Sequence, residues 1–441
     1  MKRHAIFLAI LAFSQPLAAA DLLQIYREAR ANDPVYASAR AARDAGRENL
    51  PQGLALLLPT IGATGFTQMN NIDISFRGVL PESVREGNSN GYTVSLTQPL
   101  FNWQSIMLYK EAGFKVAQTE AAFGQAAQDL IVRVSQAYFD VLASQDTLAF
   151  IQAQKTAISE QLAQAKRNFE VGTATITDTH EAQARFDLST SQEIAAQSDL
   201  EIKQRTLQQI IGKYPDRLTP LRLSIELNPP KNAMELWVTS AEEQNFSVRI
   251  QEAALEIATR EIERARSGHY PTLNMVSNYG KNSAAIFSSG TISIPTDTVS
   301  RTLGLQIAIP LYAGGNVNSL VRQAIANQEK ARQDLENARR SAALAARQAW
   351  LGFANGMAQV RALQQALVSS QSALDSNKLG YEVGVRINID VLNAQQQVFS
   401  TMRDLSKAKY DTLMNGLRLR AAAGTLNEED LETANRLLGT D

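Results

Sequence analysis

Few side chains in this 441-residue chain have the types and spacing that catalysis requires. The three histidines are His4, His180 and His269, and none belongs to an HExxH metal motif. The chain also lacks a GxSxG nucleophile motif, a P-loop and a GxGxxG dinucleotide motif. His180 lies near Asp178 and Glu181, which permits a metal site, but such a group at a helix start more often provides capping and solvated charge. We therefore expect no enzyme activity, no cofactor and no metal.

The most informative polar residues gather at two glycine turns. Thr177 and Asp178 follow the first turn, and Tyr381, Arg386 and Asp390 surround the second. In one interpretation the two aspartates begin helices and Arg386 is a solvated loop charge. The residues alone do not decide whether these groups have a further role.

The two turns occupy equivalent positions of an internal repeat. The segment NFEVGTATITDTHEAQ at 168–183 aligns without a gap with GYEVGVRINIDVLNAQ at 380–395, which is 212 residues later. The same separation recurs between Pro59 and Pro271, each of which lies in a similar tripeptide. A period this long is too large for a solenoid repeat, so it indicates the duplication of a whole half-protein.

Four short segments with two-residue periodicity predict β-strands. They lie beside Pro59, Pro99, Pro271 and Pro310, and the segment LGLQIAI before Pro310 is the clearest example. A length of about ten residues suits strands that cross a bilayer at a tilt, although ordinary hairpins of a soluble sheet show the same alternation. Four strands cannot close a barrel, which needs about eight. If the strands are in lipid, where open edges are forbidden, the chain must oligomerise, and two copies supply eight strands and three supply twelve.

The segments between the strand pairs predict unusually long helices. Proline-free stretches rich in Ala and Gln run from about Ser105 to Phe169 and from about Gly315 to Gly380, roughly 100 Å each at 1.5 Å per residue. Shorter helices of about 35 residues follow the glycine turns, over Asp178–Gly212 and Asp390–Gly424. Each half of the chain therefore contains one helical hairpin.

Two further helices, predicted over Leu22–Leu50 and Met234–Gly268, have the length to extend the shorter members of these hairpins. The sequence then divides into a signal peptide, a first repeat, a proline-rich connector, a second repeat and a C-terminal segment. The signal peptide covers 1–20 and the connector covers 214–232. The first repeat covers 21–213, with strands at about 58–100, and the second covers 233–425, with strands at about 271–311. The C-terminal segment covers 426–441.

Composition narrows the class of protein. Lys2 and Arg3, an apolar run and three alanines at 18–20 form a secretory signal peptide, so we expect the mature chain to begin at Asp21. Without Lys2 and Arg3 the chain has 41 basic and 44 acidic residues, which argues against nucleic acid as a partner. Cysteine is absent, which excludes disulfides and a lipid-modified cysteine.

Taken together, these features resemble the TolC family of outer-membrane channel proteins. The resemblance is carried by SLTQPLFN at 95–102, FEVGTATITD at 169–178, GYEVGVRINIDVLNAQ at 380–395 and GTLNEEDL at 424–431. It implies an α+β membrane protein that is a homotrimer in the outer membrane of a Gram-negative bacterium. Long α-helical hairpins would form a periplasmic α-barrel, and four strands per protomer would form a twelve-stranded transmembrane β-barrel in outer-membrane lipid.

The function that the resemblance implies is a passive exit duct for proteins, small toxic compounds or both. Such a duct docks with a periplasmic adaptor protein and an inner-membrane ABC or proton-driven transporter, and the pump sets the choice of substrate. The main alternative is a periplasmic adaptor, which also has long helical hairpins, and a secreted filament or translocator protein is a second. Neither alternative accounts as well for a duplicated hairpin with strands at the helix ends.

The resemblance also implies roles for the residues at the glycine turns. They match a periplasmic gate network in which Asp178 accepts hydrogen bonds from Tyr381 and Arg386, with Thr177 beside it. Lys409 matches a basic position that reaches a neighbouring protomer. These roles would replace the simpler interpretation of capped helix starts.

A separate implication concerns the pore. Asp390 matches a pore-lining aspartate that forms a ring of three and makes the constriction cation-selective. The family has a second aspartate three residues later, where this chain has Asn393. We therefore expect three carboxylates at the constriction in place of six.

Overall fold

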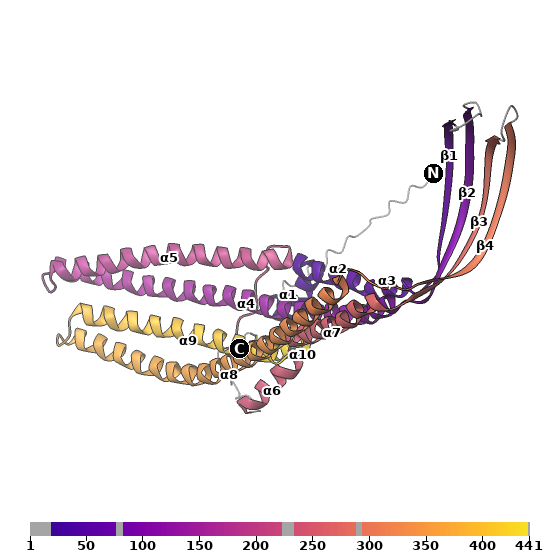
Figure 1. The fold of residues 1–441 in the computed structure, drawn as a ribbon. Helices are drawn as coiled ribbons and strands as arrows, with labels where there is room; N and C mark the ends of the chain where they lie inside the picture. The colour runs from indigo at the N-terminus through magenta and orange to yellow at the C-terminus, as the bar shows by residue number, and fades with distance from the viewer. Residues whose placement is uncertain (1–18, 76–82, 223–232, 288–292, 440–441) are drawn as a thin grey trace, which may run out of the picture. The chain divides into compact units, whose positions relative to one another are not determined.

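The structure is a computed structural model that describes residues 19–75, 83–222, 233–287 and 293–439 (Figure 1). The expected signal peptide lies outside these residues except for Ala19 and Ala20, and so does the 223–232 part of the expected connector. The chain forms two compact units. The hairpin unit comprises Met1–Ala41, Ala122–Val248 and Ala338–Asp441, and the strand unit comprises Ala42–Ala121 and Arg249–Asn337.

Two helical hairpins dominate the hairpin unit, which confirms the long hairpins expected from the sequence. Helix α4 (Trp103–Glu170, 68 residues) turns into α5 (Ile176–Ile211, 36 residues). In the second repeat, α8 (Asn316–Glu382, 67 residues) turns into α9 (Asn388–Ala422, 35 residues). Figure 1 shows α5 lying along α4 and α9 lying along α8. The close match in length between the two hairpins is the structural form of the 212-residue repeat.

The shorter helices are more broken than expected. In place of one helix over Leu22–Leu50 there are three, α1 (Leu22–Asn32), α2 (Pro34–Arg47) and α3 (Asn49–Ala55). Met234–Gly268 contains α6 (Met234–Gln244), α7 (Phe246–Arg266) and the start of the 3₁₀ turn η1 (Ser267–His269), and α10 (Glu428–Asn435) follows α9. Among the described residues no helix has the apolar length that crossing a membrane requires.

The break after α1 has a local cause. Pro34 has no N–H group and disfavours helical geometry at the residue before it, so α1 ends and α2 begins at this point. The Asp33 carboxylate, 3 % exposed, accepts the Tyr36 N–H at 3.1 Å and a hydrogen bond from Arg133 of α4 at 2.6 Å. The joint is therefore anchored to the long helix.

The main hydrophobic core lies in the hairpin unit, where α1, α4, α5, α9 and α10 meet. Its fully buried side chains include Leu22, Leu130, Tyr138, Ile211 and Met414. The buried hydroxyl of Tyr138 donates to backbone carbonyls, and its oxygen lies 2.8 Å from that of Thr219. Each large buried side chain contributes roughly 1.5–3 kcal/mol, so this core holds the two repeats together.

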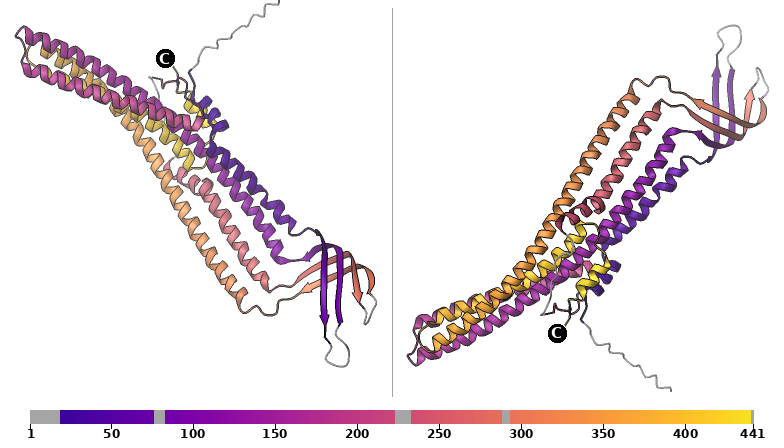
Figure 2. Two further views of the ribbon diagram at one scale, coloured as in Figure 1. Left: turned by 90° about the horizontal axis from the view of Figure 1, so that it is seen from above. Right: turned by 90° about the horizontal axis from the view of Figure 1, so that it is seen from below.

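The strand unit contains one antiparallel sheet with the order β1-β2-β3-β4. Its strands are β1 (Thr60–Ile74), β2 (Ser83–Phe101), β3 (Thr272–Phe287) and β4 (Ser293–Ala308). The strands have 15 to 19 residues where about ten were expected, because pairing continues into the polar segments between the two strands of each pair. Figure 2 shows the four strands side by side, and β2 pairs with β3 so that the two repeats share one sheet.

Candidate functional site

The two glycine turns have the same backbone geometry. Gly172 and Gly384 both have φ of 78°, in the left-handed region that glycine adopts without strain. The residue after each glycine donates its N–H to the carbonyl five residues earlier, at 2.8 Å in the first turn and 2.9 Å in the second. The duplicated sequence therefore builds one turn twice, and differences between the turns arise from side chains.

The helix caps after the two turns differ, and this decides the partners of the two aspartates. Thr175 caps α5, and Asp178 accepts both the Thr175 hydroxyl at 2.7 Å and its backbone N–H at 3.0 Å. The equivalent cap position of α9 is Ile387, which has no polar side chain. Asp390 is therefore not used for capping, and its carboxylate lies 3.6 Å from the Arg386 guanidinium. Asp178 and Asp390 both lie in the first turn of their helices, but only Asp178 makes capping hydrogen bonds.

The structure brings Asp178, Tyr381 and Arg386 to the lining of one pocket of about 590 Å³ between the turns. The Tyr381 hydroxyl accepts a hydrogen bond from the Asn168 amide at 3.3 Å. Within the single chain, Tyr381 does not donate a hydrogen bond to Asp178, and neither does Arg386, although the family resemblance led us to expect both bonds. The pocket brings the proposed partners together, while each is bonded to a neighbour.

Two side-chain amides that the sequence analysis missed join the hairpins at this level. The Gln161 amide of α4 donates to Asn388 of α9 at 2.5 Å, and both side chains are buried. The Asn168 bond to Tyr381 links α4 to α8 in the same way. No local signal pointed to this contact, because Asn388 occupies the repeat position of Ile176, which is 46 % exposed.

The two residues assigned to the pore lie on one side of α9. The Asp390 side chain is 33 % exposed, so part of it is open to solvent. The Asn393 side chain is exposed, and its amide oxygen accepts a hydrogen bond from Arg185 of α5 at 2.9 Å. Arg185 was not identified from the sequence.

The other two expected gate residues lie apart from this pocket. Thr177 is exposed on the first turn of α5 and does not line the pocket. Lys409 lies 19 residues beyond Asp390 on α9, roughly 28 Å along the helix axis. Burial lowers the pKa of the Lys409 amine, and the nearby Asp146 carboxylate opposes the shift. Lys409 therefore belongs to a different level of the hairpin.

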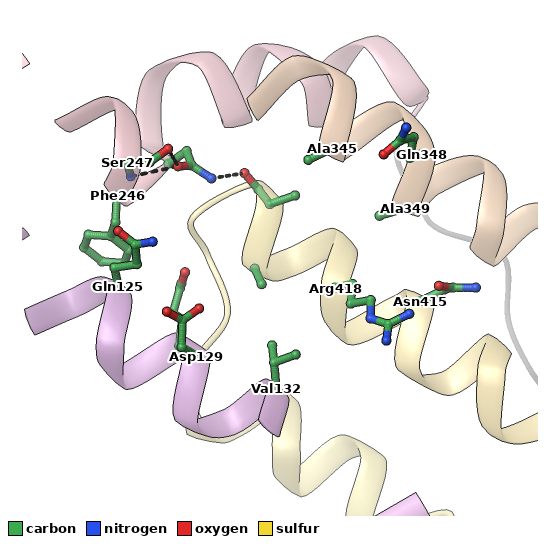
Figure 3. Close-up of a pocket in the computed structure, with 14 residues that line it drawn as sticks. Gln125, Asp129, Val132, Phe246, Ser247, Ala345, Gln348, Ala349, Asn415 and Arg418 are labelled. Atoms are coloured by element: carbon green, nitrogen blue, oxygen red, sulfur yellow. Dashed lines mark hydrogen bonds between the residues drawn. The ribbon is translucent and has the colours of Figure 1, made fainter. Parts of the chain in front are cut away.

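A second pocket of about 520 Å³ lies within the hairpin unit among α4, the start of α7, α8 and α9. Figure 3 shows Gln125, Gln348, Asn415 and Arg418 around it, with Asp129 as a carboxylate. Burial raises the pKa of Asp129, and Arg133 opposes the shift. The lining combines amides, one carboxylate and one guanidinium with apolar side chains such as Val132 and Phe246. Among the described residues no group of three His, Asp or Glu side chains could hold a metal ion.

Comparison with known proteins identifies the family. The model for "Outer membrane efflux protein" matches residues 25–213 and again 237–425, two ranges that start and end 212 residues apart. The outer membrane protein TolC of Vibrio cholerae serotype O1 is 34 % identical over 95 % of this chain and 93 % of its own length. The alkaline protease secretion protein AprF of Pseudomonas aeruginosa is 32 % identical over 94 % of this chain and 86 % of its own length.

Solved structures have the same fold. The Campylobacter jejuni CmeC outer membrane channel superposes with a TM-score of 0.80 at 15 % identity, over 99 % of this chain and 98 % of that chain. These comparisons decide against the adaptor and filament alternatives and against an enzyme. The chain belongs to the outer membrane efflux protein family and is an export channel of the TolC type, located in the outer membrane of a Gram-negative bacterium and extending into the periplasm.

Proposed function

We propose that three copies of the chain assemble into the channel. The observation that carries this proposal is the open sheet, because β1 and β4 each have one unpaired edge in the single chain. Each unsatisfied backbone group in lipid costs several kcal/mol, so edges of this length must pair with other copies. Three copies supply twelve strands, the number implied by the resemblance, and the helical hairpins continue that barrel as an α-barrel.

Exposed apolar side chains support the same assembly. On β4, Leu303, Leu305 and Ile307 are 75 %, 69 % and 62 % exposed, and they alternate with small or polar residues. This pattern fits a strand with one face in lipid and the other toward a pore. On the helices, Ile194 of α5 and Val368 of α8 are 61 % and 60 % exposed, as expected of surfaces that neighbouring copies cover.

The described helices and strands support the proposed division of the chain into two repeats at 21–213 and 233–425 around a connector at 214–232. Each repeat supplies one strand pair to the sheet and one long hairpin. In the assembly, each copy therefore contributes two equivalent segments to the wall of the duct, which makes the wall nearly sixfold symmetric.

The glycine turns form the proposed periplasmic gate. In the closed state Thr177, Asp178, Tyr381 and Arg386 hold neighbouring hairpins together, and Lys409 reaches a neighbouring copy farther along the wall. Two independent observations favour this role: a shared pocket lined by three of these residues, and polar bonds between hairpins at the same level. A constriction that opens needs bonds weak enough to exchange. A neutral hydrogen bond contributes only about 0.5–1.5 kcal/mol, and the Arg386 side chain that pairs with Asp390 is exposed.

Asp390 is the proposed pore-lining residue, with three carboxylates around the threefold axis. Its partial exposure and its freedom from capping support this role. The proposed partners are a periplasmic adaptor and an inner-membrane ABC or proton-driven transporter. Proteins are the favoured cargo, because relatives such as AprF and the proteases secretion protein PrtF of Dickeya chrysanthemi are named for the secretion of proteases.

The trimer is tested by cross-linking between strand edges, and the absence of native cysteine gives a clean background. Ile61→Cys on β1 is combined in turn with Cys at Leu303, Leu305 and Ile307 on β4, because the register between copies is to be found by the scan. Oxidation in outer membranes should give bands of one, two and three chains and none larger, and Ile61→Cys alone should give no trimer. A ladder that ends at two chains, or no ladder from any pair, would contradict the proposal.

A further inference from the structure

Arg185 makes a two-pronged contact between the hairpins beside the proposed constriction. One guanidinium nitrogen, Nη2, donates to Asn393 Oδ1 at 2.9 Å, and the other, Nη1, donates to Gln396 Oε1 at 2.5 Å. Arg185 belongs to α5, whereas both acceptors belong to α9, more than 200 residues later. A planar guanidinium that uses both terminal nitrogens on two acceptors is held in a defined orientation.

The acceptors place this charge close to Asp390. Asp390, Asn393 and Gln396 are spaced by three residues on α9, so they lie along one side of the helix. Neighbours at this spacing have Cβ atoms roughly 5–6 Å apart. The guanidinium that bonds Asn393 is therefore about one helical turn from the Asp390 carboxylate, and it is a different cation from Arg386, which pairs with that carboxylate at 3.6 Å.

Packing underneath keeps Arg185 in this position. Ala182, one turn before Arg185 on α5, is fully buried in a small cluster with Ile158, Leu162 and Leu392. Phe186, the residue after Arg185, packs against the same cluster. The two helices are thus in close contact at this level, and the arginine lies at the border of their interface, half-buried.

We propose that Arg185 is a determinant of the channel's ion selectivity and of its closed state, an inference that rests on the proposed function and on the proposed place of Asp390. Every copy then brings an Arg185 charge in addition to the Arg386 charge that pairs with Asp390, so the constriction attracts cations much less than a ring of three carboxylates would alone. The Arg185 side chain also clamps α9 to α5 and opposes the separation of the hairpins. Asn393, an amide in place of a second aspartate, accepts this contact without adding a negative charge.

The two parts of the proposal are separated by two substitutions at one position. Arg185→Gln removes the charge. At an effective dielectric between 40 and 80, a unit charge changes the local concentration of a permeant ion about 6 Å away by roughly three- to tenfold. Arg185→Lys keeps the charge but cannot form the two-pronged contact. The matched control is Arg205→Gln, since Arg205 is also on α5 but bonds Glu201 of the same helix at 2.8 Å.

The measurement is the reversal potential and single-channel conductance in a planar bilayer under a KCl gradient, with trimers purified for each variant. Arg185→Gln should raise the ratio of K⁺ to Cl⁻ permeability about three- to tenfold, Arg185→Lys should keep the wild-type ratio and raise conductance, and Arg205→Gln should change neither. An unchanged permeability ratio in Arg185→Gln would overturn the inference.

The outcome is distinguishable from a failure of the proposed function. If the wild-type trimer conducts and Asp390→Asn alters its selectivity, the channel and its constriction stand, whatever Arg185 does. If the wild-type protein forms no conducting trimer, the proposed assembly fails first. An equal shift in Arg185→Gln and Arg205→Gln would show a general effect of net charge and would also overturn the inference.

Discussion

The gate can be opened by removing two polar side chains at the second glycine turn. Tyr381→Phe deletes the hydroxyl that bonds Asn168 at 3.3 Å, and Arg386→Ser deletes the partner of Asp390 at 3.6 Å. We expect the double variant to assemble normally, because Tyr381→Phe keeps the ring that packs against the Leu374, Val391 and Val398 cluster, and the Arg386 side chain is mostly exposed. The expected change is a shift of the equilibrium between closed and open tips.

The magnitude follows from the type and exposure of the two contacts. A neutral hydrogen bond contributes about 0.5–1.5 kcal/mol, and an exposed ion pair contributes about 0.2–1 kcal/mol. The Arg386 side chain is 59 % exposed, so the lower part of the second range applies. The Arg386–Asp390 pair joins residues four apart and does not link the hairpins, so the difference comes from the Tyr381 bond between α8 and α4. The loss is then about 0.5–1.5 kcal/mol per copy and about 1.5–4.5 kcal/mol over three copies, which corresponds to about a 10- to 2,000-fold shift toward the open state.

The assay is single-channel conductance in planar bilayers, together with the susceptibility of cells to large antibiotics. Tyr214→Phe with Arg205→Ser is the matched control, because Tyr214 and Arg205 are the same residue types and contact each other near the opposite end of α5. The gate variant should conduct more than wild type and admit the antibiotics, and the control should do neither. Wild-type conductance in a correctly assembled gate variant would refute the reasoning and leave these residues with a local structural role.

Three further results are expected. A trivalent cation applied from the periplasmic side should block the wild-type channel, and Asp390→Asn should weaken the block greatly without loss of the trimer. The reason is that like carboxylates about 4 Å apart at a dielectric near 20 interact by roughly 4 kcal/mol, which a bound cation relieves. Equal block in both channels would show that Asp390 does not line the constriction. Gly424→Ala should lower the apparent Tm more than Gly172→Ala. Both glycines have positive φ, but a Cβ at Gly424 would clash with the backbone oxygen of Gln244, whereas one at Gly172 meets nothing within 4 Å. Equal Tm values would contradict this. Burial raises the pKa of Asp33, but Arg133 and backbone N–H groups outweigh this effect and hold the pKa below its ordinary value, so the carboxylate stabilises the fold above about pH 4 and this contribution is lost as the pH falls through the pKa of the folded state. Thermal melts from pH 5 to pH 2.5 should show a steeper fall in Tm for wild type than for Asp33→Asn. Parallel curves would show that the ion pair has no such role.

The overall plan was predictable because it depends on local pattern. The 212-residue repeat, the long proline-free helices and the alternating strands beside prolines are each visible within a short window of sequence. The glycine turns were predictable for the same reason, since positive φ at Gly172 and Gly384 requires a residue without a Cβ. Family membership follows from these local features together.

The sequence by itself therefore determined the elements, their order and the place of the turns, whereas only the tertiary structure decided the partners of the polar residues. Asp178 is held by Thr175 three residues away, a contact that capping rules could have predicted. Arg185 meets Asn393, and Gln161 meets Asn388, across more than 200 residues of chain. Such pairings depend on how two helices are rotated and shifted against each other, which is fixed by packing of side chains such as Ala182 and Leu392 rather than by any local signal.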